Sequence, residues 1–484
     1  MEQTKELIYG LKDRPPLRET IFAAVQHLLA IFVAIITPPL IISSALEFDL
    51  ETTGFLVSMS LFVSGIATFI QCKRFGSLGA GLLCIQGTSF SFISPIIGAG
   101  MLGMVGGKMN VGMGLSYIFG ACMVASVVEM LVSRVLPYMR KIITPLVSGI
   151  VVTLIGLCLI KAGINSCGGG QAAMNAGTFG SMQNLGLALL VLVSIVAFNR
   201  SSNPFLRMAS IVLGLILGST VAYFLGLIDF SRLGDTGALN IPVPFKYGLR
   251  FDIGSIIGLG LIYLVTAVEA YGDITANSLI SGEPVEGPVF MKRAQGGILA
   301  DGFNSLLAAV FNSFPNSIFA QNNGMIQLTG VASRYVGYFV AGALFVLGLF
   351  PIVGQFFSLI PDCVLGGATL LMFGTVAAAG IRIIAATAIN RKAVLVMAIS
   401  FAMGLSVELV PNILGQMPEV IRNIFSSGIT MGGLTAILAN ALIRIKEQKI
   451  RVKFCDFTLF FSFLFLSLQK IIASLKQRNY GKRK

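Results

Sequence analysis

The sequence contains no tryptophan, only one histidine, and charged side chains on only 11% of its 484 residues. Soluble domains carry about 25% charged residues, so this scarcity argues against an ordinary soluble protein. The seven cysteines show no CxxC spacing, and with a single histidine beside them we expect no metal or iron–sulfur site of the usual ligand types. The sequence also lacks a nucleophile elbow and a constellation of metal ligands, so we do not expect an enzyme.

Apolar residues make up 55% of the chain. They are gathered in runs of about 20 residues, the length at which a helix crosses a hydrocarbon core of ~30 Å. We therefore predict an all-α polytopic membrane protein, embedded in the lipid bilayer of the inner (plasma) membrane. The fourteen predicted segments lie at roughly 21–45, 53–71, 77–98, 112–133, 143–163, 183–198, 208–228, 254–278, 294–312, 318–330, 335–358, 364–385, 393–410 and 425–443.

The basic residues, which give the chain a net charge of +13, cluster at the ends of these segments. This pattern is typical of membrane topology, so we expect no nucleic-acid partner. If the N-terminus is cytoplasmic, every strongly basic loop falls on the cytoplasmic side, which predicts that both termini lie in the cytoplasm. Residues 1–20 are charged and lack the apolar core of a signal peptide, so we assign them to a cytoplasmic N-terminal segment that is not removed.

Two segments are interrupted by polar residues, glycine and proline. They read GLLCIQGTSFSFISPI (81–96) and NSFPNSIFAQNNGMIQLTG (312–330). Because unpaired backbone groups are not tolerated against lipid, we expect two discontinuous helices, each joined to a short extended piece and buried in protein. They are segments 3 and 10 of the fourteen. Interrupted segments at corresponding places in two halves indicate the binding site of a transporter.

The offset of seven segments predicts an inverted repeat of seven plus seven. Gly149 and Gly156 of segment 5 have the same spacing as Gly367 and Gly374 of segment 12, and segments 5 and 12 are again seven apart. Chance is a competing explanation, because the chain contains 55 glycines.

These patterns divide the chain into a transporter domain and two flanking pieces. The transporter domain spans 21–445, with a first repeat at about 21–230 and a second at about 250–445. A basic and apolar tail follows at 446–484, and its apolar run at 454–468 is short for a span and fits the inner membrane interface. The pattern indicates no function for this tail.

Ionisable groups inside apolar segments cost at least about 2.5–3.5 kcal/mol at the bilayer centre, and therefore mark candidate functional sites. Glu269 and Asp273 lie four residues apart on one helical face, Asp301 lies in the next segment, and His27 lies in the first. Asp301 has no Lys or Arg beside it in the sequence, so burial should favour its protonated form and let it carry a proton.

The other three groups have structural as well as functional interpretations. Glu269 is either a buried carboxylate bonded to a neighbouring helix or an acceptor for two N–H groups of a planar heterocycle. Asp273 fits a structural cap or partner equally well. His27, next to Gln26 on an otherwise apolar helix, fits a packing role better than proton transfer.

Three consecutive carboxamides stand in the second interrupted segment, Gln321, Asn322 and Asn323. An amide offers one acceptor and two donors in a single plane, which suits the edge of a base that presents both. The structural alternative is that these amides form hydrogen bonds with backbone groups left unpaired where the helix is interrupted. We predict that Asn323 and Gly324 begin a half helix whose N–H groups point into the cavity.

The stretch QNNGMIQLTG, from Gln321 to Gly330, resembles the signature Q/E-N-x-G-x(4)-T-K/R/G of the nucleobase–ascorbate transporters, also called nucleobase:cation symporter-2. It fits at every defined position. Gln26 and His27 resemble the QH motif of that family's first span. That family also has a set of conserved acidic residues in spans 8 and 9, and the residues that resemble it here are Glu269, Asp273 and Asp301. The resemblance covers about residues 5–445 and is greatest to the bacterial xanthine permeases.

This resemblance implies a core domain and a gate domain in the inverted repeat, usually as a homodimer, and import of a base with a proton. No cofactor other than the coupling proton is implied. Glu269 and Gln321 would hold the base, while Phe90 and Ala320 would offer ring stacking and backbone contacts. Asp301 would be the proton-linked carboxylate, together with Glu269. The remaining implied positions are Ser89 and Asn322, which would tune the choice of base, and the structural or gating residues His27, Asp273 and Gly324.

Xanthine is the first candidate substrate, taken up by proton-coupled symport through alternating access. Gln321 is the amide variant of the signature, which resembles the purine type. Urate is the second candidate, because the small Ser89 leaves room for its additional oxygen, and hypoxanthine or guanine would indicate a broader purine permease. An anion carrier of related architecture is a further alternative, although neither 81–96 nor 312–330 contains a Lys or Arg to attract an anion.

Overall fold

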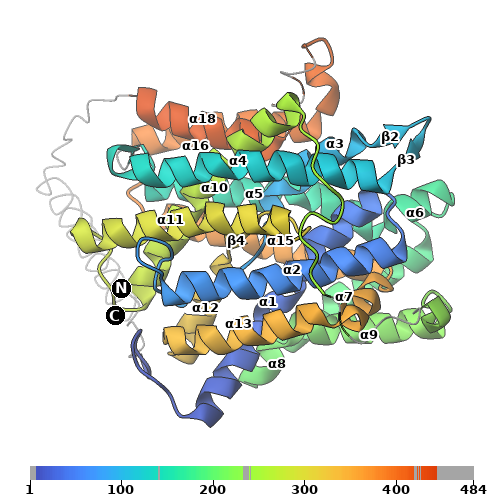
Figure 1. The fold of residues 1–484 in the computed structure, drawn as a ribbon, viewed down its shortest axis with the longest axis horizontal. Coiled ribbons are helices and arrows are strands. Elements are labelled where there is room, and N and C mark those ends of the chain that lie inside the picture. Colours follow the sequence, from blue (N-terminus) through green and yellow to red (C-terminus); the bar gives the residue numbers. More distant parts are fainter. Residues whose placement is uncertain are drawn as a thin grey trace, which may run out of the picture. The chain divides into compact units, whose positions relative to one another are not determined.

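The computed structural model describes residues 7–139, 142–232, 239, 241–418, 422, 425 and 427–443, and the predicted tail at 446–484 lies outside them. Within the described residues the chain is a bundle of long helices, many of which run side by side (Figure 1). The helices are α1 (Leu17–Ala45), α2 (Leu50–Lys73), α3 (Ile93–Met101), α4 (Val111–Met139), α5 (Pro145–Cys167), α6 (Gly170–Asn175), α7 (Met182–Asn199), α8 (Pro204–Met208), α9 (Ser210–Phe224), α10 (Ile253–Ile280), α11 (Gly287–Val310), α12 (Ala320–Thr329), α13 (Arg334–Leu349), α14 (Pro351–Ser358), α15 (Asp362–Ala385), α16 (Arg391–Leu409) and α18 (Gly428–Leu442).

Eight helices of the described chain are long and apolar enough to cross a membrane: α1, α2, α4, α5, α7, α10, α15 and α16. Helices α13 and α14 pass the same test together but are bent by 79° at the break between them, and counting them as one span makes nine. The predicted class of helical multi-pass membrane protein is therefore confirmed. The count of fourteen segments stays a prediction.

Polar caps mark where several of these helices begin. The Asp49 carboxylate accepts a hydrogen bond from the Thr52 N–H at 2.9 Å, which fixes the start of α2. At α5, the Thr144 hydroxyl accepts from the Val147 N–H at 3.5 Å, and Pro145 occupies the first turn. The first N–H groups of a helix have no partner within it, so such caps set the boundary between loop and apolar run.

The two interrupted segments each contain a short strand followed by a short helix. Strand β1 (Gln86–Thr88) pairs antiparallel with β4 (Asn316–Ile318), and Gly87 lies opposite Ser317. A 3-10 turn (Phe90–Phe92) and α3 follow β1, and α12 follows β4 directly. The extended pieces predicted for these segments are thus confirmed. Helix α12 begins at Ala320, so the predicted start at Asn323 and Gly324 is wrong by about one turn.

Side-chain hydroxyls pair with the backbone of each strand on the side away from its partner strand. The Thr68 hydroxyl of α2 accepts from the Gln86 N–H at 3.0 Å and donates to the Gln86 carbonyl at 3.4 Å. The Ser305 hydroxyl of α11 does the same for Asn316, at 3.1 Å in both directions. Extended backbone at membrane depth is stable only when such groups are paired within the protein.

Helices α5 and α15 approach closely at Gly149 and Gly156, where a methyl group on either glycine would meet atoms of α15. Gly367 instead faces α7, and a methyl group on Gly374 would have no atom within 4 Å. The two pairs of glycines therefore make different contacts, so their equal spacing adds no support to the repeat, which stays a prediction. Equal spacing specifies a helical face but not the helix that packs against it.

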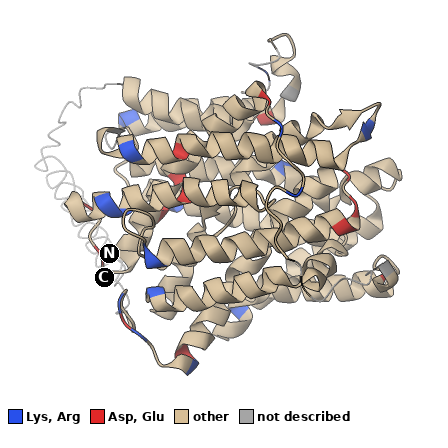
Figure 2. Cartoon of the chain, viewed as in Figure 1, with Lys and Arg blue, Asp and Glu red and all other residues tan. Residues whose placement is uncertain are grey.

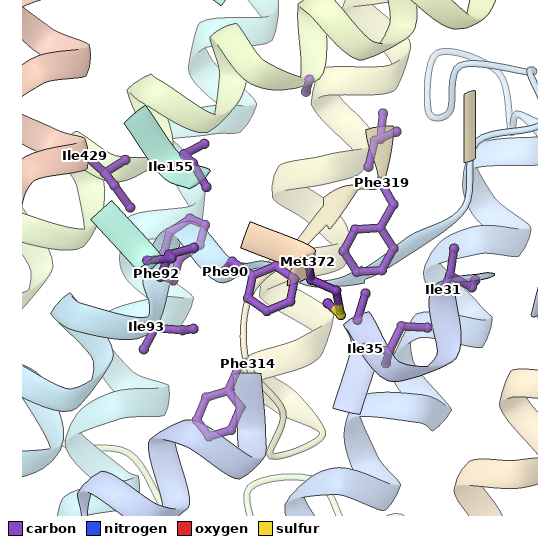
Figure 3. Packing of buried hydrophobic residues seen from close by; sticks show 14 of the residues in the cluster. Ile31, Ile35, Phe90, Phe92, Ile93, Ile155, Phe314, Phe319, Met372 and Ile429 are labelled. Atoms are coloured by element: carbon purple, nitrogen blue, oxygen red, sulfur yellow. The ribbon is translucent and has the colours of Figure 1, made fainter. Parts of the chain in front are cut away.

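A second, smaller sheet lies outside the bundle of long helices. Strands β2 (Met104–Val105) and β3 (Lys108–Met109) pair antiparallel between α3 and α4. The buried apolar core surrounds the β1–β4 pair, and Figure 3 shows Phe90, Phe319 and Met372 near one another in this region. The interrupted segments are therefore enclosed by packed side chains.

Candidate functional site

The β1–β4 pair brings the two interrupted segments together at one place. The Ser89 N–H donates to the Pro315 carbonyl at 2.8 Å, which places the turn after β1 beside the entry to β4. The Phe319 N–H donates to the Ile85 carbonyl at 3.0 Å, which places the start of α12 beside the entry to β1. Four of the predicted substrate-binding residues therefore flank this sheet: Ser89, Phe90, Ala320 and Gln321.

Glu269 of α10 is tied to the same region. The Ser91 hydroxyl donates to Glu269 Oε2 at 3.3 Å, which joins the carboxylate to the turn that follows β1. Glu269, Ala320 and Gln321 are partly exposed, whereas Ser89 is buried. A partly exposed carboxylate and a partly exposed amide in one region offer both acceptor and donor atoms to a small molecule.

The predicted stacking residue Phe90 lies against α15. Its ring packs edge-on to Phe373, with ring centroids 5.3 Å apart and an angle of 86° between the planes. Edge-to-face packing of this kind is a favourable arrangement for two aromatic rings. The contact joins an interrupted segment to α15, so a displacement of α15 relative to the strands would change the surroundings of the Phe90 ring.

The second and third carboxamides belong to a buried polar network. Asn322 is fully buried beside His27, and its Nδ2 donates to the Leu83 carbonyl. Asn277 Nδ2 of α10 donates at 2.9 Å both to Leu83 and to Asn323 Oδ1. Asn322 and Asn323 thus hold α12 to the stretch that precedes β1. His27 is in a position that fits the predicted packing role.

Two further residues of α12 lie outside this network. Gly324 is partly buried, and a methyl group built on it would have no atom within 4 Å. Gln327 is exposed. The polar residues of the signature therefore have different surroundings, with Gln321 partly exposed at the sheet and Asn322 and Asn323 in the interior.

Asp301 of α11 is fully buried and hydrogen-bonded to β1. Gln86 Nε2 donates to Asp301 Oδ1, and Gln86 Oε1 accepts from Asn304 Nδ2 one helical turn further along α11. The Gln86 side chain therefore joins the strand to the predicted proton carrier. Sequence reasoning did not single out Gln86, although it stands within the interrupted segment 81–96.

Glu129 of α4 is a second interior carboxyl group that sequence reasoning missed. It is fully buried, it accepts a hydrogen bond from the Thr266 hydroxyl at 3.4 Å, and it interacts directly with the Asp301 side chain. A signal existed, because Glu129 is the one acidic residue in the predicted segment 112–133. The criterion that selected Asp301 applies to it equally.

The interior contains acidic groups without cationic partners. Figure 2 shows acidic positions on helices inside the bundle, while most Lys and Arg stand toward helix ends. Within the described ranges, a salt bridge joins Arg293 to Glu283 at 2.8 Å, and Glu129, Asp273 and Asp301 have none. Asp273 is buried, and its backbone carbonyl accepts from Asn323 Nδ2 at 3.4 Å, which suits a structural role.

Sequence comparisons identify relatives over nearly the whole chain. Residues 18–413 match the Xan_ur_permease model, described as Permease family. "Xanthine permease XanP" of Escherichia coli is 52% identical over 92% of this chain and 96% of its own length. "Xanthine permease XanQ" of E. coli is 45% identical over 90% and 94%, and "Uric acid permease PucJ" of Bacillus subtilis is 33% identical over 88% and 93%.

Solved structures of similar fold are more distant in sequence. The transmembrane domain of a cyanobacterial bicarbonate transporter, BicA, aligns with a TM-score of 0.57 at 17% identity, covering 84% of this chain and 99% of that domain. The anion transporter SLC26A9, whose murine form was solved in an inward-facing state, aligns with a TM-score of 0.56 at 11% identity over 88% of this chain and 69% of its own. At such identities the likeness establishes the fold alone.

Proposed function

The chain belongs to the nucleobase–ascorbate transporter family, and on that basis we propose that it imports xanthine across the membrane together with a proton. It is a permease and not an enzyme. One structural observation carries the substrate class: the region around β1 and β4 presents a partly exposed carboxylate, Glu269, and a partly exposed amide, Gln321. These groups suit the N–H and carbonyl groups along the edge of a purine base.

Xanthine ranks first because two relatives with that substrate in their names share 52% and 45% of aligned residues with this chain. Urate ranks second, supported by the name of the relative at 33% identity. Hypoxanthine and guanine would make the chain a broader purine permease. An anion carrier is the third alternative, because a bicarbonate transporter has a similar fold. Against this alternative, 81–96 and 312–330 contain no Lys or Arg to attract an anion.

In the proposed complex, Glu269 and Gln321 hold the base through hydrogen bonds. Phe90 provides a ring face, and the backbone of Ala320 at the start of α12 provides further contacts. Ser89 limits the space near the ring and so influences which purine fits. Asn322 acts on the choice of base indirectly, because its side chain fixes α12 to the stretch before β1.

Matching helix contacts support the seven-plus-seven inverted repeat. If α1, α2, β1–α3, α4, α5, α7 and α9 correspond in order to α10, α11, β4–α12, α13, α15, α16 and α18, packed pairs recur in both halves. The packing of α4 on α11 corresponds to that of α13 on α2, and the packing of α7 on α9 corresponds to that of α16 on α18. The hydroxyl contacts of Thr68 to β1 and Ser305 to β4 follow the same correspondence.

The same contacts support a division into core and gate domains. Helices α5, α7, α9, α15, α16 and α18 pack mainly among themselves, while α1, α2, α10 and α11 contact the two strands and α4 and α13 pack on α11 and α2. Alternating access then requires the first group to move against the second. We further propose that both termini are cytoplasmic, since most basic residues gather toward one end of the bundle in Figure 2. A homodimer in the inner membrane is proposed on the family resemblance alone.

Asp301 is the proposed proton carrier of this cycle. It is fully buried, and Gln86 connects it to the strand that flanks the base site. One proton moving inward gains about 2.3 kcal/mol per 100 mV, which is enough for about fiftyfold accumulation of a neutral base. No cofactor besides the proton is needed.

Uptake of radiolabelled xanthine into cells that lack their own purine permeases tests the proposal. We expect saturable accumulation that a protonophore abolishes, and competition by urate, hypoxanthine and guanine ranks the alternatives. In Asp301→Asn, we expect accumulation against a gradient to be lost. Absence of uptake for every purine would refute the substrate class, and unchanged protonophore-sensitive accumulation in Asp301→Asn would refute the assigned carrier.

A further inference from the structure

Helices α4 and α11 come unusually close together next to Asp301. A methyl group built on the neighbouring Gly302 would lie 3.0 Å from the Ser126 carbonyl oxygen and 3.0 Å from the Met130 backbone nitrogen, both on α4. Such distances are shorter than ordinary contacts between atoms without a hydrogen bond. Only a residue without a Cβ permits this approach, which places the side chains of Glu129 and Asp301 in direct contact.

Each of the two carboxyl groups has one oxygen that accepts a hydrogen bond and one that does not. Glu129 Oε1 accepts from Thr266, and Asp301 Oδ1 accepts from Gln86. Among the described residues, no donor reaches Glu129 Oε2 or Asp301 Oδ2, although both side chains are fully buried. A single proton between the two groups would satisfy both oxygens at once, since one carboxyl would then donate and the other accept.

The surrounding groups favour one proton rather than none. Helix α10 contributes Glu269, Asp273 and Tyr263, α4 contributes Cys122, and Cys84 precedes β1. None of them is a cation, and Arg293 of α11 is paired with Glu283. Two ionised carboxylates in contact inside a low-dielectric interior repel each other strongly, so such pairs retain a proton in common.

We propose that Glu129 and Asp301 form a carboxyl pair that shares the coupling proton, so that Glu129 is the second holder of the proton during transport. This inference rests on the proposed function as a proton-coupled permease. In the loaded state the proton lies between the two side chains. When the site opens to the cytoplasm, the proton leaves to water and both carboxylates are ionised. The Gln86 hydrogen bond then transmits the change at Asp301 to β1 and the base site.

The test compares the pH dependence of xanthine uptake into proteoliposomes for the wild type, Glu129→Gln, Glu129→Asp and Ser133→Ala. In Glu129→Gln a neutral amide replaces the second carboxyl and donates to Asp301, which then holds its proton only at lower pH. We expect the midpoint of the uptake profile to move to more acidic pH by at least about one unit, a tenfold change in proton concentration. Glu129→Asp should restore most of the wild-type profile.

Ser133→Ala is the matched control on the same helix. Ser133 is buried one turn beyond Glu129, and its hydroxyl bonds only to the Met130 carbonyl of its own helix, so its profile should match the wild type. If the midpoint is unchanged in Glu129→Gln while wild-type uptake still depends on pH, the shared proton is refuted but proton coupling is not. A wild type with no response to pH overturns proton coupling itself.

Infrared difference spectroscopy provides a readout that does not depend on transport. At neutral pH, we expect the wild type minus Glu129→Gln and the wild type minus Asp301→Asn difference spectra to contain the same C=O stretch of a buried protonated carboxyl group. Absence of this stretch from both difference spectra would place the proton on another group, such as Glu269, and would overturn the pair.

Discussion

Alanine at Gly156 should push α5 and α15 apart. A Cβ at this position would lie 2.6 Å from the Phe373 carbonyl oxygen and 2.7 Å from the Ala377 Cα, and these are backbone atoms that cannot rotate away. The Ala377 backbone nitrogen is closer still, so restoring ordinary contact requires the helices to separate by about 1 Å, and a gap of this size forfeits about a quarter to a half of the dispersion energy of neighbouring contacts. Overpacking of this kind costs about 1–3 kcal/mol.

Gly374→Ala is the matched control, because Gly374 lies on the second helix of the same pair and a methyl group added there would have no atom within 4 Å. Both substitutions gain the same helix propensity, about 1 kcal/mol, so the difference between the two variants isolates the packing cost. We expect Gly374→Ala to be as stable as the wild type or slightly more stable, and Gly156→Ala to be less stable than Gly374→Ala by about 1–3 kcal/mol.

The assay is thermal unfolding of the purified protein in detergent, with the amount of folded protein followed by size-exclusion chromatography after heating. Gly156→Ala should lose its folded peak at a lower temperature than both the wild type and Gly374→Ala. Small residues let transmembrane helices approach, so the contact is expected to matter in lipid as well. Equal unfolding temperatures for the two variants would refute the close approach of α5 and α15.

Two other predictions concern the interrupted segments. Gln321→Glu should change which purines compete for xanthine uptake, because the substitution replaces an N–H donor group by an acceptor oxygen. Gln327→Ala should leave the competition unchanged, because Gln327 is exposed. A changed competition profile in Gln327→Ala would show that the site extends further along α12. Gln86→Leu should lower the unfolding temperature by a loss of about 1–3 kcal/mol, since it removes the donor to Asp301 Oδ1 and one of the two acceptors of Asn304 Nδ2, the other being the Ala67 carbonyl. Unchanged stability would show that the Gln86 hydrogen bonds contribute little.

The sequence predicted the interrupted segments well, because a polar group in an apolar run has few acceptable explanations. Glycine, proline and carboxamides in 81–96 and 312–330 indicated extended backbone, and β1 and β4 lie there. The helix start was less predictable. Gly324 suggested the beginning of α12, but the helix begins at Ala320, since the start depends on where pairing with β1 ends.

Long-range partners were beyond prediction from one sequence. Gln86 stands 215 residues before Asp301, and nothing in either local pattern indicates that they meet. Glu129 met the criterion applied to Asp301 but was overlooked, and only the packing of α4 on α11 brings the two together. The roles predicted for Glu269 and Gln321 as substrate-binding groups stay predictions.

The two short helices that follow β1 and β4 also determine the charge balance of the site. A helix N-terminus carries about half a positive charge, so the starts of α3 and α12 together offset about one negative charge. One ionised carboxylate, such as Glu269, would bring the local sum close to zero. A neutral purine then enters without disturbing this electroneutrality, whereas a bicarbonate ion would leave an uncompensated charge. The two helix starts together with one ionised carboxylate would therefore favour a neutral cargo at this site.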